Sequence, residues 1–314
     1  MATTLNRSFS ELKRMLIAIA LLLSFSLQSQ SLTPVTDSKP VDFKISLAQW
    51  SLHRAFNTGS LNPTDFPEIA TSYGIYSIEL VNSFYKTKAN DMAYWKTFKQ
   101  KCEDANVNVG LIMCDGLGHL GDADAQKRQK TVENHFAWVD IAKYLGAHSI
   151  RVNAAGKGNS DEVALYVIDG LTKLGKYGAS KGINIIVENH GGYSSNGAWL
   201  ANVMENVNME NVGTLPDFGN FCMTRATNRN CLDEYDRYKG MTELMPFAKG
   251  VSAKSHDFDA TGKETKSDFF KMMAIVKASG YKGYIGIEYE GRELSEDEGI
   301  KATKALLENV LAKL

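Results

Sequence analysis

Four ionisable residues in the second half of the chain lie at the ends of short apolar runs. Three carboxylates and one imidazole are ligands that one divalent ion, such as Mn²⁺, Zn²⁺, Mg²⁺ or Co²⁺, accepts, and they leave positions open for water or a substrate oxygen. Alone, a carboxylate at a strand end often only caps the next helix, but four on successive runs are harder to explain by capping. The predicted ligands, spaced by 29, 39 and 32 residues, are Glu188, Asp217, His256 and Glu288.

Eight short apolar runs are the elements that would position these side chains. They are rich in β-branched residues and continuous rather than alternating, which is typical of parallel strands covered on both faces. Longer segments with helical spacing separate them, and several end in Gly, which favours a left-handed helix cap. The runs are 44–50, 75–81, 107–114, 148–153, 183–189, 212–217, 249–256 and 283–289.

Eight strands alternating with helices predict an α/β fold, a single-domain (β/α)8 TIM barrel over residues 42–314. A doubly wound open sheet is the alternative, but it usually carries a Gly-rich phosphate turn after an early strand, and this sequence has none. Active sites of barrels lie at the carboxyl ends of the strands. Because consecutive strands are neighbours in a barrel, the four ligands are expected to converge.

The first 30 residues are typical of a secretory signal peptide. Arg7, Lys13 and Arg14 precede the apolar run 15–27, whose 13 residues are short for a membrane span. The run has no polar face, which argues against an amphipathic helix. We therefore expect residues 1–30 to be removed on export, residues 31–41 to form a short tail, and the mature protein to be periplasmic or secreted, without a membrane segment.

The composition of the 314 residues limits the partners. With 35 basic and 36 acidic residues, the chain lacks the basic excess that favours nucleic acid or an anionic membrane. Export permits disulfides, so Cys222 and Cys231 could pair within the polar loop 218–232, a candidate lid or rim element. Cys102 and Cys114 are expected to be buried thiols. The sequence leaves open whether the protein forms homo-oligomers.

Further polar residues are candidates for substrate binding. Residues two apart on a strand share a face, so some of these candidates should point the same way as the predicted ligands. The pairs are His190 with Glu188, Lys254 with His256, and Glu290 with Glu288.

Lys254 has two interpretations. A buried lysine is costly without a partner, so it either polarises a substrate oxygen or pairs with Glu79 or another strand-end carboxylate. Arg151 is expected to be a structural ion-pair partner. The other substrate-binding candidates each have a structural alternative; they are His119 in a Gly-rich loop, Asn153 on the fourth strand and Trp50 near the end of the first.

The segments IIVENHGG, LPDFGNF, SAKSHDF and YIGIEYEG resemble the four metal-bearing segments of the xylose-isomerase-like barrels, the sugar phosphate isomerase/epimerase superfamily. The resemblance extends over residues 42–314 and is most specific at the last segment. It implies that Glu188, Asp217, His256 and Glu288 hold one divalent metal. It also implies that Glu188 and Glu288 flank a carbohydrate substrate as an acid/base pair.

Paired carboxylates suit proton transfer next to a carbonyl. One removes the proton to give an enediolate, whose charge a divalent ion stabilises, and the other returns a proton to either face or to the neighbouring carbon. The predicted function is a sugar isomerase or epimerase. The alternatives are a lyase acting by β-elimination on a keto-sugar or 3-keto-glycoside, and a non-catalytic periplasmic sugar-binding barrel. A DNA-repair nuclease of this fold would need further His ligands, and the chain has six His in all.

Two positions depart from the ketose 3-epimerases of this superfamily. Those enzymes resemble one another in a His three residues after the metal Asp and an Arg six residues after the metal His, where this chain has Asn220 and Gly262. Both groups help to hold ketose hydroxyls, so the departures disfavour a free-ketose 3-epimerase. Export also disfavours phosphorylated sugars, which are mostly cytosolic.

Overall fold

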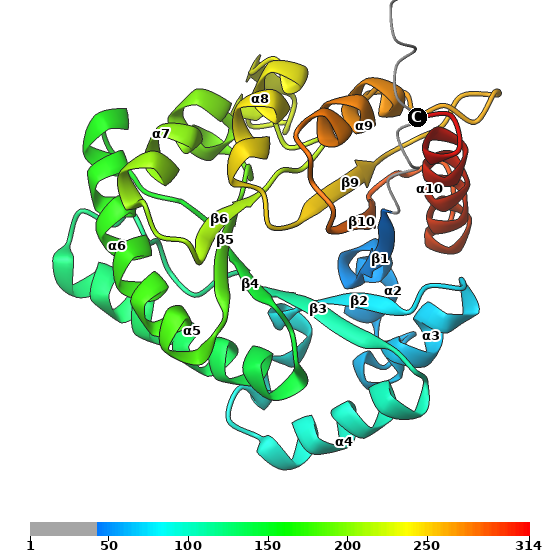
Figure 1. Ribbon diagram of the computed structural model, residues 1–314, viewed down its shortest axis with the longest axis horizontal. Helices are drawn as coiled ribbons and strands as arrows, with labels where there is room; N and C mark the ends of the chain where they lie inside the picture. The colour runs from blue at the N-terminus through cyan, green and yellow to red at the C-terminus, as the bar shows by residue number, and fades with distance from the viewer. Residues whose placement is uncertain (1–42) are drawn as a thin grey trace, which may run out of the picture. The chain divides into compact units, whose positions relative to one another are not determined.

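The eight apolar runs form eight parallel strands around a common axis (Figure 1). The structure, a computed structural model, describes residues 43–314, and the predicted signal peptide and tail lie outside them. The predicted (β/α)8 barrel is confirmed. The barrel strands are β1 (Lys44–Ala48), β2 (Ser77–Val81), β3 (Asn108–Met113), β4 (Ser149–Val152), β5 (Asn184–Glu188), β6 (Val212–Leu215), β9 (Val251–Ser255) and β10 (Tyr284–Tyr289).

Helices cover the outside of the barrel (Figure 1). Asn, Asp or Ser side chains cap the first turns of most of them, as Asp124 does for α5. Helices α5 and α6 end at Gly146 and Gly182, whose φ angles of 82° and 72° confirm the predicted left-handed caps. The helices are α2 (His53–Thr58), α3 (Phe66–Ser72), α4 (Met92–Asp104), α5 (Ala125–Leu145), α6 (Ser160–Lys181), α7 (Gly197–Val207), α8 (Arg237–Leu244), α9 (Phe269–Ala278) and α10 (Glu296–Leu311).

None of the helices within residues 43–314 combines the length and the apolar character that a membrane span requires.

The barrel closes between β6 and β9. The strands are hydrogen-bonded in the order β6-β5-β4-β3-β2-β1-β10-β9, and a parallel bridge between Asp217 and Ser252 joins the two ends. The Ser252 N–H donates to Pro216 O at 2.9 Å, and the Phe218 N–H donates to Ser252 O at 3.0 Å. One predicted metal ligand therefore lies in the seam that completes the barrel.

The barrel interior contains an apolar cluster and a polar region whose residues are in register with it on neighbouring strands. The apolar cluster contains Ala48, Val81, Leu111, Met113, Ile186 and Leu215. Buried charges are costly unless they are paired, so the polar region needs an explanation beyond packing. Its buried side chains include Ser46, Glu79, Arg151, Glu188, Ser252, Lys254 and Glu288.

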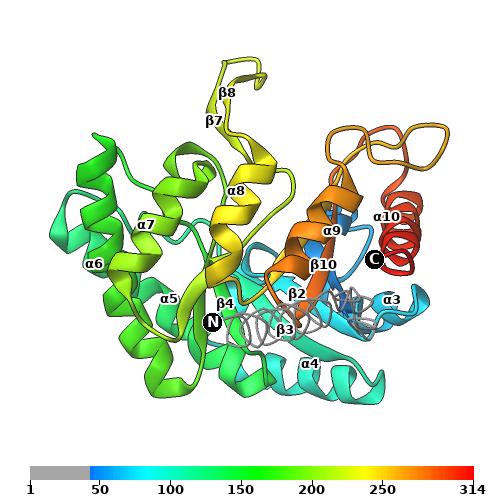
Figure 2. The ribbon, with the colours of Figure 1, turned by 45° about the horizontal axis from the view of Figure 1, so that its top comes forward.

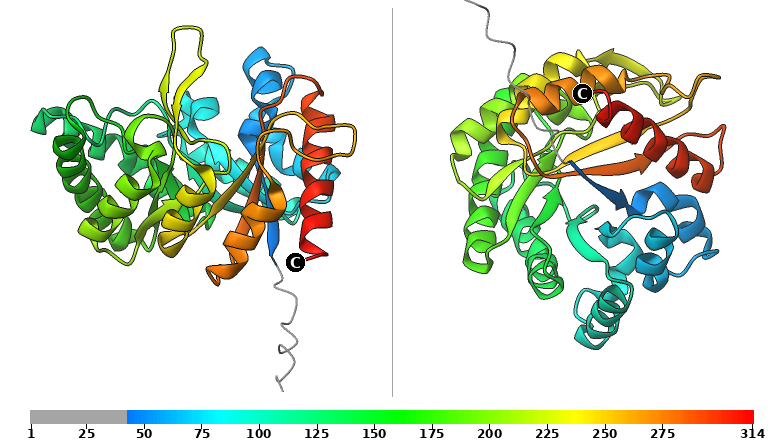
Figure 3. Two further views of the ribbon diagram at one scale, coloured as in Figure 1. Left: turned by 90° about the horizontal axis from the view of Figure 1, so that it is seen from above. Right: turned by 45° about the vertical axis from the view of Figure 1, so that its right-hand side comes forward.

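A β-hairpin that was not predicted from the sequence follows β6. Strands β7 (Cys222–Arg225) and β8 (Cys231–Glu234) pair in antiparallel fashion. A disulfide between Cys222 and Cys231 joins them, as the sequence allowed, whereas Cys102 and Cys114 are buried free thiols. The hairpin projects from the barrel (Figure 2) at the same end as the loops that follow β9 and β10 (Figure 3).

Candidate functional site

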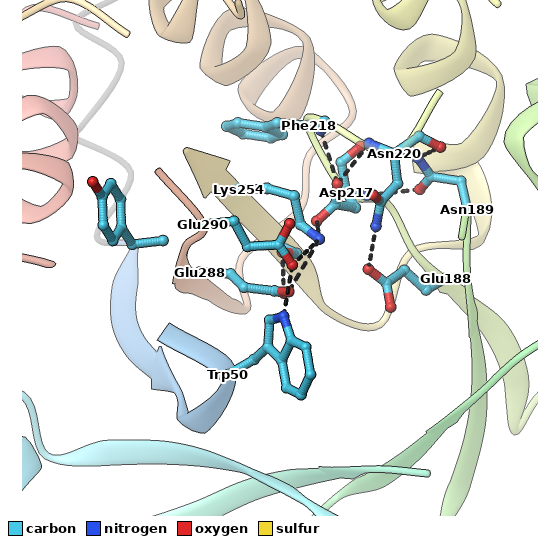
Figure 4. A network of polar contacts seen from close by, with 12 residues as sticks. Trp50, Glu188, Asn189, Asp217, Phe218, Asn220, Lys254, Glu288 and Glu290 are labelled. Atoms are coloured by element: carbon cyan, nitrogen blue, oxygen red, sulfur yellow. Dashed lines mark hydrogen bonds and ion pairs between the residues drawn. The ribbon is translucent and has the colours of Figure 1, made fainter. Parts of the chain in front are cut away.

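Three of the four predicted metal ligands lie together at the carboxyl ends of the strands (Figure 4). Glu188, Asp217 and Glu288 each offer a carboxylate oxygen, and these oxygens lie within 4.8 Å of one another. All three residues are buried, with 1%, 0% and 3% of their surface exposed. They come from the end of β5, the segment after β6, and β10, so the barrel geometry alone brings them together.

Backbone amides and an asparagine fix the position of Asp217. Its Oδ1 accepts hydrogen bonds from the N–H groups of Gly219 and Asn220, both at 2.8 Å. The Asn189 side chain accepts from the Asp217 N–H at 2.7 Å and donates to its carbonyl at 3.0 Å. The other oxygen, Oδ2, has no hydrogen bond within residues 43–314. One oxygen thus orients the carboxylate, and the other, which lies 3.9 Å from Lys254 Nζ, is placed to bind a cation.

A neutral donor and a cation hold Glu188. Asn220 Nδ2 donates to Oε1 at 2.9 Å, and Arg151 Nε lies 2.9 Å from Oε2 without the alignment of a hydrogen bond. Arg151 also donates to Asp115 Oδ1 at 2.7 Å, and Asn153 Nδ2 donates to the same oxygen at 2.7 Å. Arg151 is an ion-pair partner, as expected, and it links the predicted Asn153 to the cluster.

Glu288 is held in a similar way. Ser252 Oγ donates to its Oε2 at 3.1 Å, and Lys254 Nζ lies 3.1 Å from its Oε1. Lys254 also lies 3.3 Å from Glu290 Oε1, to which Trp50 Nε1 donates at 2.6 Å (Figure 4). The buried lysine therefore pairs with strand-end carboxylates, although its partner is not Glu79.

The cluster contains more negative than positive charge. Five carboxylates share two cations, Arg151 and Lys254. Burial raises the pKa of Asp217 to about 8; the charge of Lys254 opposes this rise, and the charges of Glu188 and Glu288 add to it. Burial also raises the pKa of Glu288. In this environment the charged forms are unfavourable, and a divalent cation would relieve the repulsion.

The donor set fits a divalent ion. Two of the carboxylate oxygens, Glu188 Oε2 and Asp217 Oδ2, are buried without a hydrogen bond among the described residues. Buried polar atoms are normally satisfied, and apart from the nearby charges of Arg151 and Lys254 these two oxygens keep lone pairs that a divalent ion could use. The residues placed to hold it are Glu188, Asp217 and Glu288. Such an all-carboxylate set suits Mg²⁺ or Mn²⁺.

The structure does not bring His256 into this group of ligands. Strand β9 ends at Ser255, one residue earlier than the sequence run suggested. The His256 side chain is 20% exposed, and its Nδ1 lies 3.8 Å from Glu264 Oε1. Burial lowers its pKa to about 4, so the imidazole is neutral at pH 7. On β9, Ser252 rather than His256 forms the parallel backbone bridge with Asp217.

The predicted substrate-binding residues divide into two sets. Lys254, Glu290, Trp50 and Asn153 take part in the contacts above. His190 is exposed and lines a cavity of about 620 Å³ with Tyr193 and Met223. His119 is exposed on the loop after β3, and none of the polar contacts recorded within residues 43–314 links its side chain to the cluster.

Sequence reasoning missed three positioning residues, namely Asn189, Asn220 and Ser252. Asn220 was noticed only as a departure from a related pattern, and the structure shows it donating to Glu188. Asn189 directly follows a predicted ligand at the end of β5, so only the pairing of β5 with β6 reveals that it faces Asp217. The polar segments ENH and DFGN were the available signal, but their partners depend on contacts between the end of β5 and the segment after β6.

Comparisons with known proteins agree with this fold. The protein-family model for the xylose isomerase-like TIM barrel matches residues 67–310. Among curated proteins, none matches the chain significantly.

Solved structures with low sequence identity share the fold. The 3-keto-D-glucoside 4-epimerase YcjR from E. coli has a TM-score of 0.62 and 15% identity, with 79% of this chain and 94% of that chain covered. D-psicose 3-epimerase, in the presence of D-fructose, has a TM-score of 0.66 and 13% identity, covering 86% and 99%. A xylose isomerase-like TIM barrel protein from Mycobacterium smegmatis, in complex with magnesium, has a TM-score of 0.64 and 15% identity, covering 87% and 97%.

Proposed function

Because this chain belongs to the xylose isomerase-like TIM barrel family, we propose that it is a divalent-metal-dependent sugar isomerase or epimerase. It would act by removing a proton next to a carbonyl. One observation carries the proposal: two buried glutamates, Glu188 and Glu288, each fixed by a cation and a neutral donor, share one site with Asp217. Two epimerases of keto-sugars and ketoses have the same fold.

Glu188, Asp217 and Glu288 would hold the ion. When bound, a divalent ion acts as a Lewis acid that stabilises negative charge on substrate oxygens. The relative from M. smegmatis binds magnesium, which agrees with the oxygen-only donor set of this chain.

The side chains of the protein would perform the proton transfer. Glu188 and Glu288 come from the two outer strands of the group β5, β6, β9 and β10, so they approach a bound sugar from different directions. One removes the proton and the other returns it, a contribution of about 10²–10⁴-fold for each placed acid or base. Arg151 and Lys254 orient the two glutamates, and Lys254 supplies a fixed positive charge because nearby carboxylates hold its pKa above the ordinary value despite burial.

The same first step serves a lyase. If the substrate has a leaving group β to the carbanion, as in a 3-keto-glycoside, proton removal would lead to elimination. Product analysis in the experiment below separates this alternative from isomerisation and epimerisation.

The test is proton exchange in D₂O. The protein starting at residue 31, loaded with Mg²⁺ or Mn²⁺, is incubated with ketoses, aldoses and 3-keto-glycosides and followed by NMR. We expect deuterium to enter a carbon next to the carbonyl, and Glu288→Gln to lower the rate at least 10²-fold. Glu103→Gln, on the exposed face of α4, is the matched control.

Two outcomes would contradict the proposal. Tight binding of sugar and metal without exchange would indicate the non-catalytic sugar-binding barrel. A protein that binds no divalent metal would remove the basis of the mechanism.

We also propose that the protein is exported. The N-terminal pattern supports this proposal, and so does the disulfide between Cys222 and Cys231, because such bonds persist in oxidising compartments. Expression of the full chain in a bacterial host should give a periplasmic or secreted product shortened by about 30 residues. Mass spectrometry of the fractions would measure the cleavage, and an uncleaved product in the cytosol would count against export.

A further inference from the structure

Cationic side chains gather at the mouth of the barrel, above the carboxylate cluster. Two adjoining cavities of about 670 and 530 Å³ share Arg229, Glu290 and Arg292 in their walls. Glu290 is the one carboxylate in either wall. The cations in the two walls are Arg54, Arg225, Arg229, Lys266 and Arg292.

Most of these cations have no counter-ion. Within residues 43–314, Arg54 Nε lies 3.6 Å from Glu296, but none of the other four cations forms an ion pair with a carboxylate. Glu290 is already engaged by Lys254 and Trp50. The whole chain has a formal net charge of −1, so the excess of positive charge is local to this mouth.

The disulfide-linked hairpin places two of the arginines. Arg225 ends β7, and Arg229 lies in the turn with a left-handed φ of 69°. The Arg225 guanidinium donates to the Arg229 carbonyl at 3.3 Å, and the disulfide cross-links the two strands. Arg292 reaches the same cavities from the loop after β10. Separate elements thus converge on one cationic space.

The cationic space continues into the proposed active site. Glu290 lines both cavities, and Lys254 connects it to Glu288 at 3.3 and 3.1 Å. A ligand held at the mouth could therefore extend its carbonyl end toward the glutamates. Guanidinium groups bind carboxylate, sulfate and phosphate oxygens in paired, charge-assisted hydrogen bonds, whereas the hydroxyls of a neutral sugar would form only weaker hydrogen bonds with these exposed side chains.

We propose that the substrate is an anionic carbohydrate, whose oxyanion group binds Arg229 and Arg292 at the mouth. This inference rests on the proposed function and names the substrate class of the same site. A rival explanation is that the rim cations only balance the negative cluster below them. In that case their removal would change metal affinity and would leave the choice of sugar unchanged.

The test compares matched sugars by isothermal titration calorimetry on the Mg²⁺-loaded protein. The neutral probes are D-glucose and D-galactose, and the anionic probes are D-glucuronate, D-galacturonate, glucose 6-sulfate and glucose 6-phosphate. We expect at least one anionic probe to bind tenfold or more tightly than its neutral partner, and high salt to weaken this preference. The strongest anionic probe identifies the oxyanion as carboxylate, sulfate or phosphate.

Two variants test whether the preference for anionic sugars arises at the mouth of the barrel. The double variant Arg229→Gln, Arg292→Gln should lose the preference and bind neutral sugars as before. Lys282→Gln should keep it, because this exposed lysine precedes β10 and lies at the opposite end of the barrel. Equal affinity for all matched pairs, or a double variant that changes only Mg²⁺ affinity, would overturn the inference.

The two proposals can fail separately. Preference for an anionic sugar without deuterium exchange would contradict the proposed function and leave standing only the binding of an anionic sugar by Arg229 and Arg292. Deuterium exchange with neutral sugars alone would support the proposed function and contradict the inference that the substrate is anionic.

Discussion

Burial shifts the pKa of individual acidic side chains in this protein, and Glu79 is one example. Glu79, on β2, is 3% exposed. Its Oε1 accepts a hydrogen bond from Ser46 Oγ at 2.6 Å, while Oε2 has no hydrogen bond within residues 43–314. Burial raises its pKa to about 7 from an ordinary value of 4.5, partly opposed by the Ser46 hydrogen bond. Such a group makes folding stability depend on pH.

The sign of that dependence can be predicted. Because the folded protein binds the Glu79 proton more tightly than the unfolded chain, this stabilisation is complete below about pH 4.5 and is lost as the pH rises through about 7. Glu79→Gln should remove up to about 3 kcal/mol of the pH dependence of the unfolding free energy. Urea unfolding in EDTA at pH 5 and pH 8 would measure it. Equal pH dependence in the variant and the parent would show that Glu79 titrates normally.

Metal binding should distinguish Asp217 from His256. Mg²⁺ at 100 times its Kd should stabilise the parent by about 2.7 kcal/mol, and His256→Ala should keep this effect because the imidazole lies outside the ligand group. Asp217→Asn should lose most of it. Thermal denaturation with and without Mg²⁺ gives the comparison. If His256→Ala abolished the shift instead, the four-ligand prediction from the sequence would be correct.

At the scale of elements, the sequence predicted regular structure well and irregular structure poorly. The eight barrel strands were visible because parallel strands covered on both faces need continuous apolar runs. The hairpin was not, because β7 and β8 are short and largely exposed, so no hydrophobic pattern marks them. Three of the four predicted ligands, all at strand ends, lie together in the structure, whereas the run at β9 was extended to His256, past the point where the strand stops.

The hairpin should depend on its disulfide. A cross-link closing a loop of this length stabilises by about 2–3 kcal/mol, and the hairpin projects from the barrel, so the effect should be local. The variant Cys222→Ser, Cys231→Ser should be cleaved by trypsin after Arg225 and Arg229 at least tenfold faster than the parent. Its barrel should melt at a similar temperature. Mass spectrometry of the timed digest would identify the cuts, and unchanged cleavage would show that the strands hold the hairpin alone.

At the scale of the whole molecule, the candidate metal site spans the closure of the barrel. Glu188 and Asp217 lie on the β5–β6 side of the seam, and Glu288 lies on the β9–β10 side. An ion bound to all three would connect the first and last parts of the hydrogen-bonded strand order. The site therefore needs the complete ring. Sequence spacing could suggest the candidate ligands, but it could not supply the side-chain contacts between neighbouring strands that hold them.

Hydrogen exchange should detect this connection. Mg²⁺ should slow exchange of the seam amides of Phe218 and Ser252 by tenfold or more, and it should affect amides between β2 and β3 much less. Asp217→Asn should remove the difference. Uniform slowing across all strands would instead mean that the seam opens only when the entire barrel unfolds.

The position of Asp217 in the seam also has a consequence for assembly order. A nascent or translocated chain with an open ring has its carboxylates in separate pieces, so it cannot capture the ion with all three. Completion of the ring and acquisition of an ion by all three carboxylates would then be a single step, and a loaded ion would mark those molecules in which β6 and β9 have met.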